Sequence, residues 1–220
     1  MAEVNIKETQ PEFVFKEKKV YDFVKRILDI IFSIIAIIVL SPVFLIVAIA
    51  IRISDGGPAI YTQTRVGKNG VQFKMYKFRS MCVNADSKEM LQQVKKLNEM
   101  DGPAFKAKND PRITRIGKVL RKTSIDELPQ LFNILIGNMT FIGPRPPLVS
   151  ETRKYTEYQK NRLLVKGGLT CYWQCSGRND IKFNEWVRLD LKYITERSLL
   201  TDLKIILLTV PAVFSGKGAN

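Results

Sequence analysis

The sequence predicts a mostly helical α+β protein in which one long apolar helix precedes a domain that contains a small β-hairpin. Residues 27–53 form a single apolar run, residues 59–63 are typical of a short strand, and residues 71–76 alternate apolar and polar side chains after an Asn-Gly turn. Later segments, such as residues 125–135, repeat their apolar residues at helical spacing. The chain has 220 residues, of which 45% are hydrophobic, so it is long and apolar enough for one domain with its own core.

The composition restricts the chemistry that the protein can perform. Lys and Arg number 35 against 21 Asp and Glu, which gives a net charge of +14 and predicts an anionic partner: nucleic acid, lipid headgroups or a phosphorylated substrate. Histidine is absent, which excludes Ser-His and Cys-His catalysis and histidine-ligated metals. The three cysteines, Cys82, Cys171 and Cys175, form no CxxC pair, so neither a disulfide framework nor a zinc site is indicated.

The apolar run at residues 27–53 is long enough for a membrane helix, which needs roughly 20 apolar residues. Pro42 lies near its middle and predicts a kink, and the hydroxyl of Ser41 can satisfy a backbone group that the proline leaves without a donor. Basic residues flank both ends of the run, and the positive-inside rule places both flanks in the cytosol. A re-entrant helix with a break at Ser41-Pro42 satisfies both observations, and a kinked helix that crosses the membrane is the alternative.

A β-hairpin is predicted around Asn69-Gly70, which is a strong turn signal. After the turn, apolar and polar side chains alternate from residue 71 to residue 76. If the strand continues, Lys77 points to the same face as the apolar side chains and needs an anion beside it. If the strand stops at residue 76, Lys77 is solvated.

Residues 110–122 predict a basic amphipathic helix that opens at Asp110-Pro111. Its apolar residues fall on one face, and five basic side chains surround that face: Arg112, Arg115, Lys118, Arg121 and Lys122. Such a helix suits an anionic membrane surface, and a solvated surface helix is the simpler alternative.

Two short motifs carry the main candidates for a functional site. Ser124 followed three residues later by Glu127 is a capping-box pattern, which places Asp126 and Glu127 in the first turn of a helix. The alternative is that these acidic residues have no role beyond offsetting the helix dipole. Residues 143–147, Gly-Pro-Arg-Pro-Pro, hold Arg145 between prolines. This loop can present the guanidinium to a phosphate, or it can be a rigid loop with an exposed arginine.

The remaining candidates lie after residue 170. Five side chains there can line a nucleotide site, or they can belong to the core and its turns: Tyr172, Trp173, Gln174, Arg178 and Asn179. Residues 199–214 predict a helix with a broad apolar face, suited to packing in the core or at a membrane surface.

At these residues the chain resembles the bacterial sugar transferases, the small monotopic phosphoglycosyl transferases. The resemblance covers nearly everything from Lys25 to Phe214. It rests on KRILDI at 25–30, Ser41-Pro42, YKFRSM at 76–81, NDPRITRIGKVLRKTSIDELPQLFNIL at 109–135, GNMTFIGPRPP at 137–147, SGRND at 176–180 and DLKYI at 190–194. The chain departs from the family at residues 171–176, where Cys-Tyr-Trp replaces the Gly-Trp-Ala run of many relatives.

The resemblance implies an enzyme that transfers a hexose-1-phosphate from a UDP-sugar to undecaprenyl phosphate, with release of UMP, through a covalent phosphosugar-aspartate. Such a reaction begins the synthesis of exopolysaccharide, capsule or another glycoconjugate. The resemblance implies Asp126 as the nucleophile, Glu127 as its catalytic partner, and Mg²⁺ as a cofactor with these two carboxylates as ligands. It implies substrate and phosphate binding by Lys77, Arg79, Arg112, Arg121, Arg145, Arg178 and Asn179. Likeness to exopolysaccharide enzymes favours glucose or galactose as the sugar.

The resemblance also implies an organisation of the chain. We expect an N-terminal cytosolic segment at residues 1–24, a re-entrant membrane helix at 25–54, and one cytosolic, membrane-associated catalytic domain with interfacial helices at 55–220. The expected location is the cytosolic face of the bacterial plasma membrane, with anionic lipids as further partners and no nucleic-acid partner. Whether the protein forms a homodimer is left open.

Three other functions fit parts of the sequence. A nucleic-acid-binding protein would use the charge of +14, but the apolar run and the scattered basic residues argue against it. A non-catalytic membrane scaffold of a polysaccharide-assembly complex would explain the helix, but not an acidic pair beside several basic residues. A polytopic phosphoglycosyl transferase would need many spans, where the sequence offers one. Release of UMP from a UDP-sugar would separate an enzyme from the first two.

Overall fold

The computed structural model describes residues 13–95, 97, 102–103, 107, 110–176 and 181–215. These residues are mostly helical and include two small two-stranded sheets, which confirms the predicted α+β class. The helices are α1 (Lys19–Asp55), α2 (Lys88–Lys95), α3 (Arg115–Lys122), α4 (Gln130–Ile136), α5 (Val149–Thr152), α6 (Glu157–Lys160), α7 (Tyr172–Cys175), α8 (Phe183–Glu196) and α9 (Leu199–Ser215). The strands are β1 (Ile60–Val66), β2 (Gln72–Phe78), β3 (Met139–Ile142) and β4 (Gly167–Thr170). Short 3₁₀ turns cover Lys68–Gly70, Ile125–Glu127 and Asn161–Leu164.

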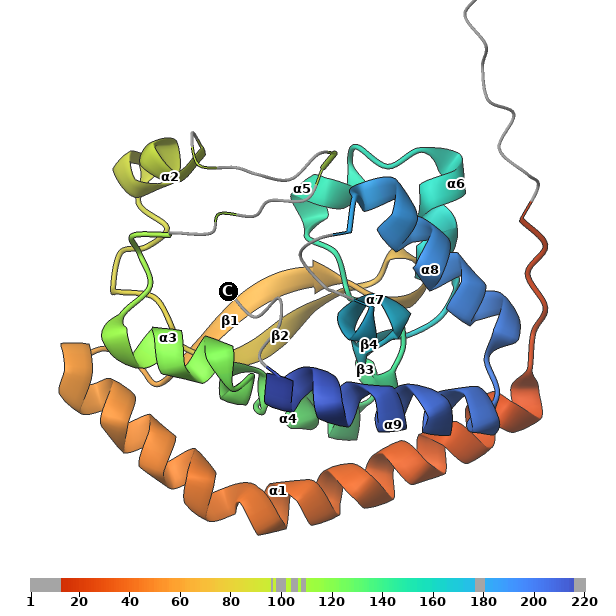
Figure 1. The fold of residues 1–220 in the computed structure, drawn as a ribbon, viewed down its shortest axis with the longest axis horizontal. Coiled ribbons are helices and arrows are strands. Elements are labelled where there is room, and N and C mark those ends of the chain that lie inside the picture. Colours follow the sequence, from red (N-terminus) through yellow and green to blue (C-terminus); the bar gives the residue numbers. More distant parts are fainter. Residues whose placement is uncertain are drawn as a thin grey trace, which may run out of the picture.

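The long helix α1 runs along one side of the molecule and is bowed (Figure 1). In this view α3, α4 and α9 lie next to α1, while α5, α6 and α8 lie on the other side of the strands. Among the helices that the structure describes, α1 is the one long and apolar enough to cross a membrane. It begins at Lys19, ahead of the predicted boundary at residue 25.

Pro42 lies inside α1, and the helix continues through it. A proline has no N–H, so the carbonyl of Ile38, four residues earlier, loses its normal helical donor. The hydroxyl of Ser41 donates to that carbonyl at 2.8 Å, as the sequence predicted. The prediction of a break in the helix at Ser41-Pro42 is therefore wrong. The helix is bowed but uninterrupted, and Ser41 replaces the hydrogen bond that Pro42 cannot make.

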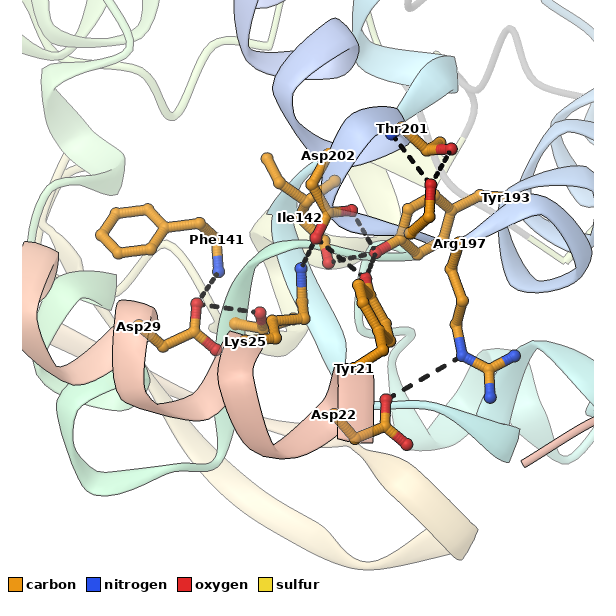
Figure 2. Close-up of polar contacts among 12 residues, drawn as sticks. Tyr21, Asp22, Lys25, Asp29, Phe141, Ile142, Tyr193, Arg197, Thr201 and Asp202 are labelled. Atoms are coloured by element: carbon orange, nitrogen blue, oxygen red, sulfur yellow. Dashed lines mark hydrogen bonds and ion pairs between the residues drawn. The ribbon is translucent and has the colours of Figure 1, made fainter. Parts of the chain in front are cut away.

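Both ends of α1 are tied to the same body of the protein. Near the N-terminal end, Lys25 forms an ion pair with Asp202 of α9 (Figure 2). At the C-terminal end, Asp55 forms an ion pair with Arg79, the residue that follows β2. α1 therefore lies along the domain and does not project away from it.

Two polar residues in the first turns of α1 add further ties. Asp29 is buried, and its carboxylate accepts hydrogen bonds from the Thr140 hydroxyl at 3.0 Å and the Phe141 N–H at 3.1 Å, both in β3 (Figure 2). Arg26 donates to two carbonyls at the C-terminal end of α4. These bonds satisfy polar groups whose burial would otherwise be unfavourable, so the start of α1 is held in a defined position.

The two faces of α1 have different surroundings. The inner face packs through Val47 and Ile51 against Phe78 of β2 and Leu120 of α3. The outer face exposes a series of large apolar side chains: Ile31, Ile34, Ile35, Ile38, Leu45, Ile46, Ile49 and Ile53. On α9, three leucines are also exposed: Leu200, Leu203 and Leu207. An apolar surface of this extent marks a contact with a membrane or with another protein.

The predicted hairpin is confirmed by the antiparallel pair β1 and β2. Its turn contains Asn69 and Gly70, both with positive φ, which these residue types tolerate. The strand β2 runs to Phe78, past the boundary that would have left Lys77 in solvent. Lys77 pairs with Tyr61 across the hairpin and lies on the inner face.

The segment between β2 and β3 packs α4 against the hairpin. The side chain of Asn133 accepts from the N–H of Tyr76 at 2.9 Å and donates to the carbonyl of Lys74 at 2.8 Å. These two bonds cover part of the free edge of β2. β3 then pairs in parallel with β4, in a separate sheet.

The structure corrects one prediction about local structure and decides a second. The basic helix α3 begins at Arg115, with the Thr114 hydroxyl as its N-cap, and not at Asp110-Pro111. Trp173 belongs to the core, where it stacks on Trp186 with ring centroids 4.2 Å apart.

Candidate active site

Asp126 and Glu127 lie in the 3₁₀ turn that connects α3 to α4. Ser124 adopts a left-handed backbone conformation with φ of 58°, and its side chain caps nothing. The predicted capping box is therefore wrong, since α4 begins only at Gln130, after Pro129. The two acidic residues precede the helix and do not occupy its first turn. Because they lie outside α4, offsetting the dipole of this helix does not explain why they are there.

Glu127 is held by two cations from distant parts of the chain. Its Oε1 accepts from Lys77 Nζ at 2.9 Å and from Arg145 Nη1 at 3.1 Å. The side chains of Lys77, Glu127 and Arg145 are 16%, 22% and 23% exposed, so all three are largely buried. Burial alone would raise the pKa of Glu127, but Lys77 and Arg145 outweigh this and hold that pKa well below its usual range. Glu127 therefore remains ionised and fixes both cations.

Asp126 differs from its neighbour in having an open carboxylate. The residue is only 8% exposed, yet no residue that the structure describes donates a hydrogen bond to the side chain, and neither oxygen is sealed from solvent. Burial and the adjacent charge of Glu127 raise the pKa of Asp126 above its usual value, against the opposing effect of Lys77, Arg121 and Arg145. A carboxylate of this kind can accept a metal ion or attack an electrophile.

The loop that carries Arg145 is clamped on both sides. On one side, the N–H of Val66 at the end of β1 donates to the carbonyl of Pro147 at 2.9 Å. On the other side, the N–H of Gly168 in β4 donates to the carbonyl of Pro144 at 2.9 Å. A Cβ at Gly168 would lie 2.1 Å from the backbone nitrogen of Gly143, so only glycine permits this approach. The clamp fixes Arg145 beside Glu127.

Arg65 is a site residue that sequence analysis missed. It is buried at the end of β1, and its Nη1 donates to the carbonyl of Pro146 at 3.1 Å. Burial and the nearby Arg145 lower the pKa of Arg65 to about 10. The strand alternation contained a signal for it. With the turn at Asn69-Gly70, antiparallel pairing places Arg65 on the same face of the hairpin as Lys77.

Arg121 approaches Asp126 from the last turn of α3. Its Nε donates to the Ser80 hydroxyl at 2.9 Å. A Cβ at residue 117 would lie 1.9 Å from the carbonyl oxygen of Ser80. α3 can approach Ser80 this closely because residue 117 is glycine. Burial lowers the pKa of Arg121, and the charge of Asp126 partly offsets this effect. Arg121 thus belongs to the charge environment of the acidic pair.

Two of the other predicted phosphate ligands are engaged by carboxylates away from the pair. Arg79 pairs with Asp55 at the end of α1. Arg112 pairs with Asp110 at 2.6 Å and also donates to the carbonyl of Ala85. The predicted ligands Arg178 and Asn179 lie outside the described residues.

The residues present fit a magnesium ion held jointly with a substrate. Among the residues that the structure describes, no group of three or more acidic, cysteine or histidine side chains could form an all-protein metal cage. Mg²⁺ is commonly bound by one or two carboxylates together with substrate phosphates, which needs no such cage. The open oxygens of Asp126 suit this role, whereas one oxygen of Glu127 is already occupied by Lys77 and Arg145.

The charges of the site are unbalanced. Four basic side chains surround the pair Asp126 and Glu127: Lys77, Arg65, Arg121 and Arg145. A surplus of buried cations with an open carboxylate at its centre is suited to an anionic ligand with several oxygens, such as a phosphate ester.

Fold and site together define an α+β protein with one exposed apolar helix and a phosphate-compatible carboxylate site. A family model described as "Bacterial sugar transferase" matches residues 20–216, and the chain belongs to this family. This confirms the resemblance seen in the sequence motifs.

Individual relatives support the same family. The chain is 51% identical over 199 residues to "Galactosyl transferase CpsE" of Streptococcus agalactiae, covering 89% of this chain and 43% of that protein. It is 42% identical over 199 residues to "Undecaprenyl-phosphate galactose phosphotransferase" of Salmonella typhimurium, covering 90% and 42%. It is 38% identical over 213 residues to "Exopolysaccharide production protein ExoY" of Rhizobium meliloti, covering 95% and 93%. The chain thus spans less than half of the first two relatives and nearly all of the third.

Proposed function

We propose that this protein transfers a hexose-1-phosphate from a UDP-sugar to undecaprenyl phosphate and releases UMP, at the start of exopolysaccharide, capsule or glycoconjugate synthesis. The names of relatives that specify undecaprenyl phosphate support this substrate class, and some of those names also specify galactose or glucose. The single observation that carries the proposal is the open carboxylate of Asp126 beside a Glu127 whose charge is fixed by Lys77 and Arg145.

The proposed reaction has two steps at one phosphorus atom. A carboxylate oxygen of Asp126 attacks the β-phosphorus of the UDP-sugar, and the bond from this phosphorus to the oxygen bridging the α-phosphate breaks. UMP leaves with that oxygen and the bonding electrons, and the sugar phosphate remains as an acyl phosphate on Asp126. A phosphate oxygen of the lipid then attacks the same phosphorus and displaces the carboxylate. No step needs a histidine or another base, because neither nucleophile carries a proton.

The surrounding residues have separate roles in this proposal. Lys77 and Arg145 contact phosphate oxygens and stabilise charge that develops as UMP leaves. Glu127 positions both cations and keeps a second negative charge beside Asp126, which maintains its basicity. Mg²⁺, held by Asp126 and the substrate with Glu127 nearby, would neutralise phosphate charge.

The decisive experiment uses a UDP-sugar labelled in the sugar, with no lipid acceptor. We expect the wild-type protein to retain label at Asp126, found by mass spectrometry, with one UMP released per label. Asp126→Asn should show neither product. If the wild type releases UMP only when lipid is present and no labelled protein can be trapped, transfer is direct and the covalent step is wrong. Release of UDP would indicate an ordinary glycosyltransferase. A panel of UDP-sugars in the same assay identifies the sugar.

We further propose that α1 is re-entrant and that the protein sits on the cytosolic face of the plasma membrane. α1 has 37 residues, which corresponds to roughly 55 Å of helix, well beyond the roughly 30 Å of a bilayer core. The ion pairs Lys25–Asp202 and Asp55–Arg79 hold its two ends on one body. A helix that crosses the membrane would have to release one of these pairs. The basic face of α3 would then contact anionic lipids.

Topology can be tested with single cysteines at Lys18 and Lys68 in a cysteine-free background. Both positions should resist an impermeant thiol reagent in intact cells and react after lysis. Labelling of the Lys18 position alone in intact cells would mean that α1 crosses the membrane. Replacing Pro42 with Ala should restore the missing helical hydrogen bond, straighten α1 and increase labelling at Lys18.

A further inference from the structure

A pocket of about 80 Å³ lies at the N-terminal end of α1, and no residue of the candidate active site lines it. Its walls come from the first turns of α1, the tip of the β1–β2 hairpin, β3, the segment before β4 and the end of α8. A single water molecule needs roughly 10–15 Å³ of such a volume. The pocket therefore has room for a polar group larger than water.

The lining carries more basic than acidic side chains: Lys25, Arg26, Lys68, Lys166 and Arg197 against Asp22 and Asp29. Three of the basic residues are engaged within the protein. Lys25 pairs with Asp202, as Figure 2 shows, and Arg26 donates to carbonyls of α4. Arg197 donates to two backbone carbonyls, those of residues 16 and 194.

Lys68 and Lys166 are not engaged in this way. Neither side chain forms an ion pair or a hydrogen bond with any residue that the structure describes. The carboxylate of Asp29 is already held by hydrogen bonds from β3 (Figure 2). Burial, together with the positive charges of Arg26 and Lys68, lowers the pKa of Lys166, although Asp29 and Asp22 partly oppose this effect. An anion in the pocket would relieve this repulsion.

The position of the pocket indicates the source of such an anion. Its walls include Arg26, and the apolar run of α1 begins at the next residue, Ile27. In the proposed membrane orientation this point lies at the depth of lipid headgroups. We propose that the pocket binds the phosphate group of an anionic phospholipid, held by Lys68 and Lys166. Because Lys68 comes from the hairpin tip and Lys166 from the lead into β4, a bound headgroup would link both elements to α1.

The test measures how many molecules of phosphatidylglycerol the full chain retains, by native mass spectrometry in a neutral detergent. The variant is K68Q/K166Q, and the matched control is K154Q/K182Q, which removes two exposed lysines next to α5 and α8. α5 and the start of α8 lie on the side away from α1 (Figure 1), whereas the end of α8 lines the pocket. A basic residue near an anionic lipid contributes about fivefold in affinity, so K68Q/K166Q should bind roughly 25-fold more weakly. The control should bind like the wild type. Equal losses in the two variants would overturn the proposal.

A second measurement does not depend on a variant that folds. Acylation of Lys166 in the wild-type protein is followed by mass spectrometry while lipid is added. Phosphatidylglycerol should protect Lys166 but not Lys154, and phosphatidylcholine should protect neither. Acylation of Lys166 that is unchanged by phosphatidylglycerol would overturn the proposal. Protection by millimolar inorganic phosphate equal to that by the lipid would also overturn it, because the pocket would then be a site for a soluble phosphate.

Discussion

Two clusters of buried charged side chains in this protein contain similar residue types but differ in their charge balance and hydrogen bonding. In the core, Arg162 donates to Asp190 at 2.8 Å, and the two side chains are 1% and 0% exposed. Arg162 also donates to the hydroxyl of Tyr155, and its guanidinium lies 4.8 Å from the ring centre of Trp186. One cation meets one anion here, and aromatic rings surround them.

The cluster at Asp126 and Glu127 has a surplus of cations and one carboxylate without a hydrogen-bond donor among the described residues. Lys77 and Arg145 share a single oxygen of Glu127, and Arg65 and Arg121 add further positive charge nearby. Burial of charge alone therefore does not indicate function. A balanced and enclosed pair stabilises the fold, whereas an unbalanced and open cluster is prepared for a ligand.

The largest contrast should come from the same substitution made in both clusters. Asp126→Asn should reduce UMP release by roughly 10⁴-fold or more, as loss of a nucleophile does. Its free energy of unfolding should change by less than about 1 kcal/mol, because this carboxylate stabilises no described partner through a hydrogen bond. Asp190→Asn should instead lower stability by about 3–5 kcal/mol, because it leaves the charge of Arg162 buried and uncompensated.

Thermal unfolding and UMP release, measured on both variants in one detergent, check this contrast. Activity should be expressed per folded molecule, so that instability of Asp190→Asn is not mistaken for a catalytic defect. The comparison fails if Asp190→Asn abolishes turnover at an unchanged melting temperature, or if Asp126→Asn turns over normally.

A smaller effect is expected from exchanging the arginine in each cluster for lysine. Arg145→Lys keeps the charge but loses the planar fork that contacts phosphate and Glu127. A hydrogen bond to a charged group contributes roughly 1.5–3 kcal/mol, so kcat/KM should fall about tenfold or more. Arg162→Lys, the matched control, should lower the melting temperature and leave kcat/KM of the folded fraction unchanged. Near-normal activity of a well-folded Arg145→Lys would remove Arg145 from the site.

The smallest effect concerns pH. Asp126 must be ionised to attack, so the rate of single-turnover labelling should rise with pH and level off above the pKa of Asp126. Burial and Glu127 raise this pKa, which places the midpoint above the usual value for aspartate of about 3.9. Arg121→Gln removes a cation that lowers the pKa of Asp126, so the midpoint should move to higher pH. A midpoint that is unchanged or moves down contradicts the assignment.

The stability of the fold must be followed over the same pH range. The pKa of Glu127 is lowered in the folded protein, so its ion pairs stabilise the fold above the unfolded value of about 4.3. That stabilisation is lost progressively as the pH falls from the unfolded value through the lowered folded value. The melting temperature at each pH provides the control.

Prediction from sequence succeeded where the determining interactions are local. The turn at Asn69-Gly70 specifies the hairpin, because these residues tolerate positive φ. The apolar run specifies the helix α1, and the proximity of Ser41 and Pro42 was enough to predict the hydrogen bond to the carbonyl of residue 38. The candidate residues Lys77 and Arg145 were found, but their shared contact with Glu127 was not.

Prediction failed where one local sequence pattern is compatible with two different structures. Ser124 and Glu127 have the spacing of a capping box, yet Pro129 delays α4 and a left-handed Ser124 turns the chain before it. Arg79 is a different case: it lies two residues from Lys77, the resemblance assigned both residues to phosphate, and this role of Arg79 stays a prediction. In the structure Arg79 pairs with Asp55, at the end of α1, and only Lys77 contacts the acidic pair.

The sequence by itself determined the α+β class, the long apolar helix, the hairpin, the family and the residue types available to the site. Only the tertiary structure decided which cations meet the carboxylates. Lys77 and Arg145 are separated from Glu127 by 50 and 18 positions, and they converge through strand register and through a loop clamped between β1 and β4. Register and docking depend on packing over the whole domain, whereas turns and helical periodicity depend on residues a few positions apart. For this reason the open carboxylate of Asp126 and the missed Arg65 became apparent only in the folded chain.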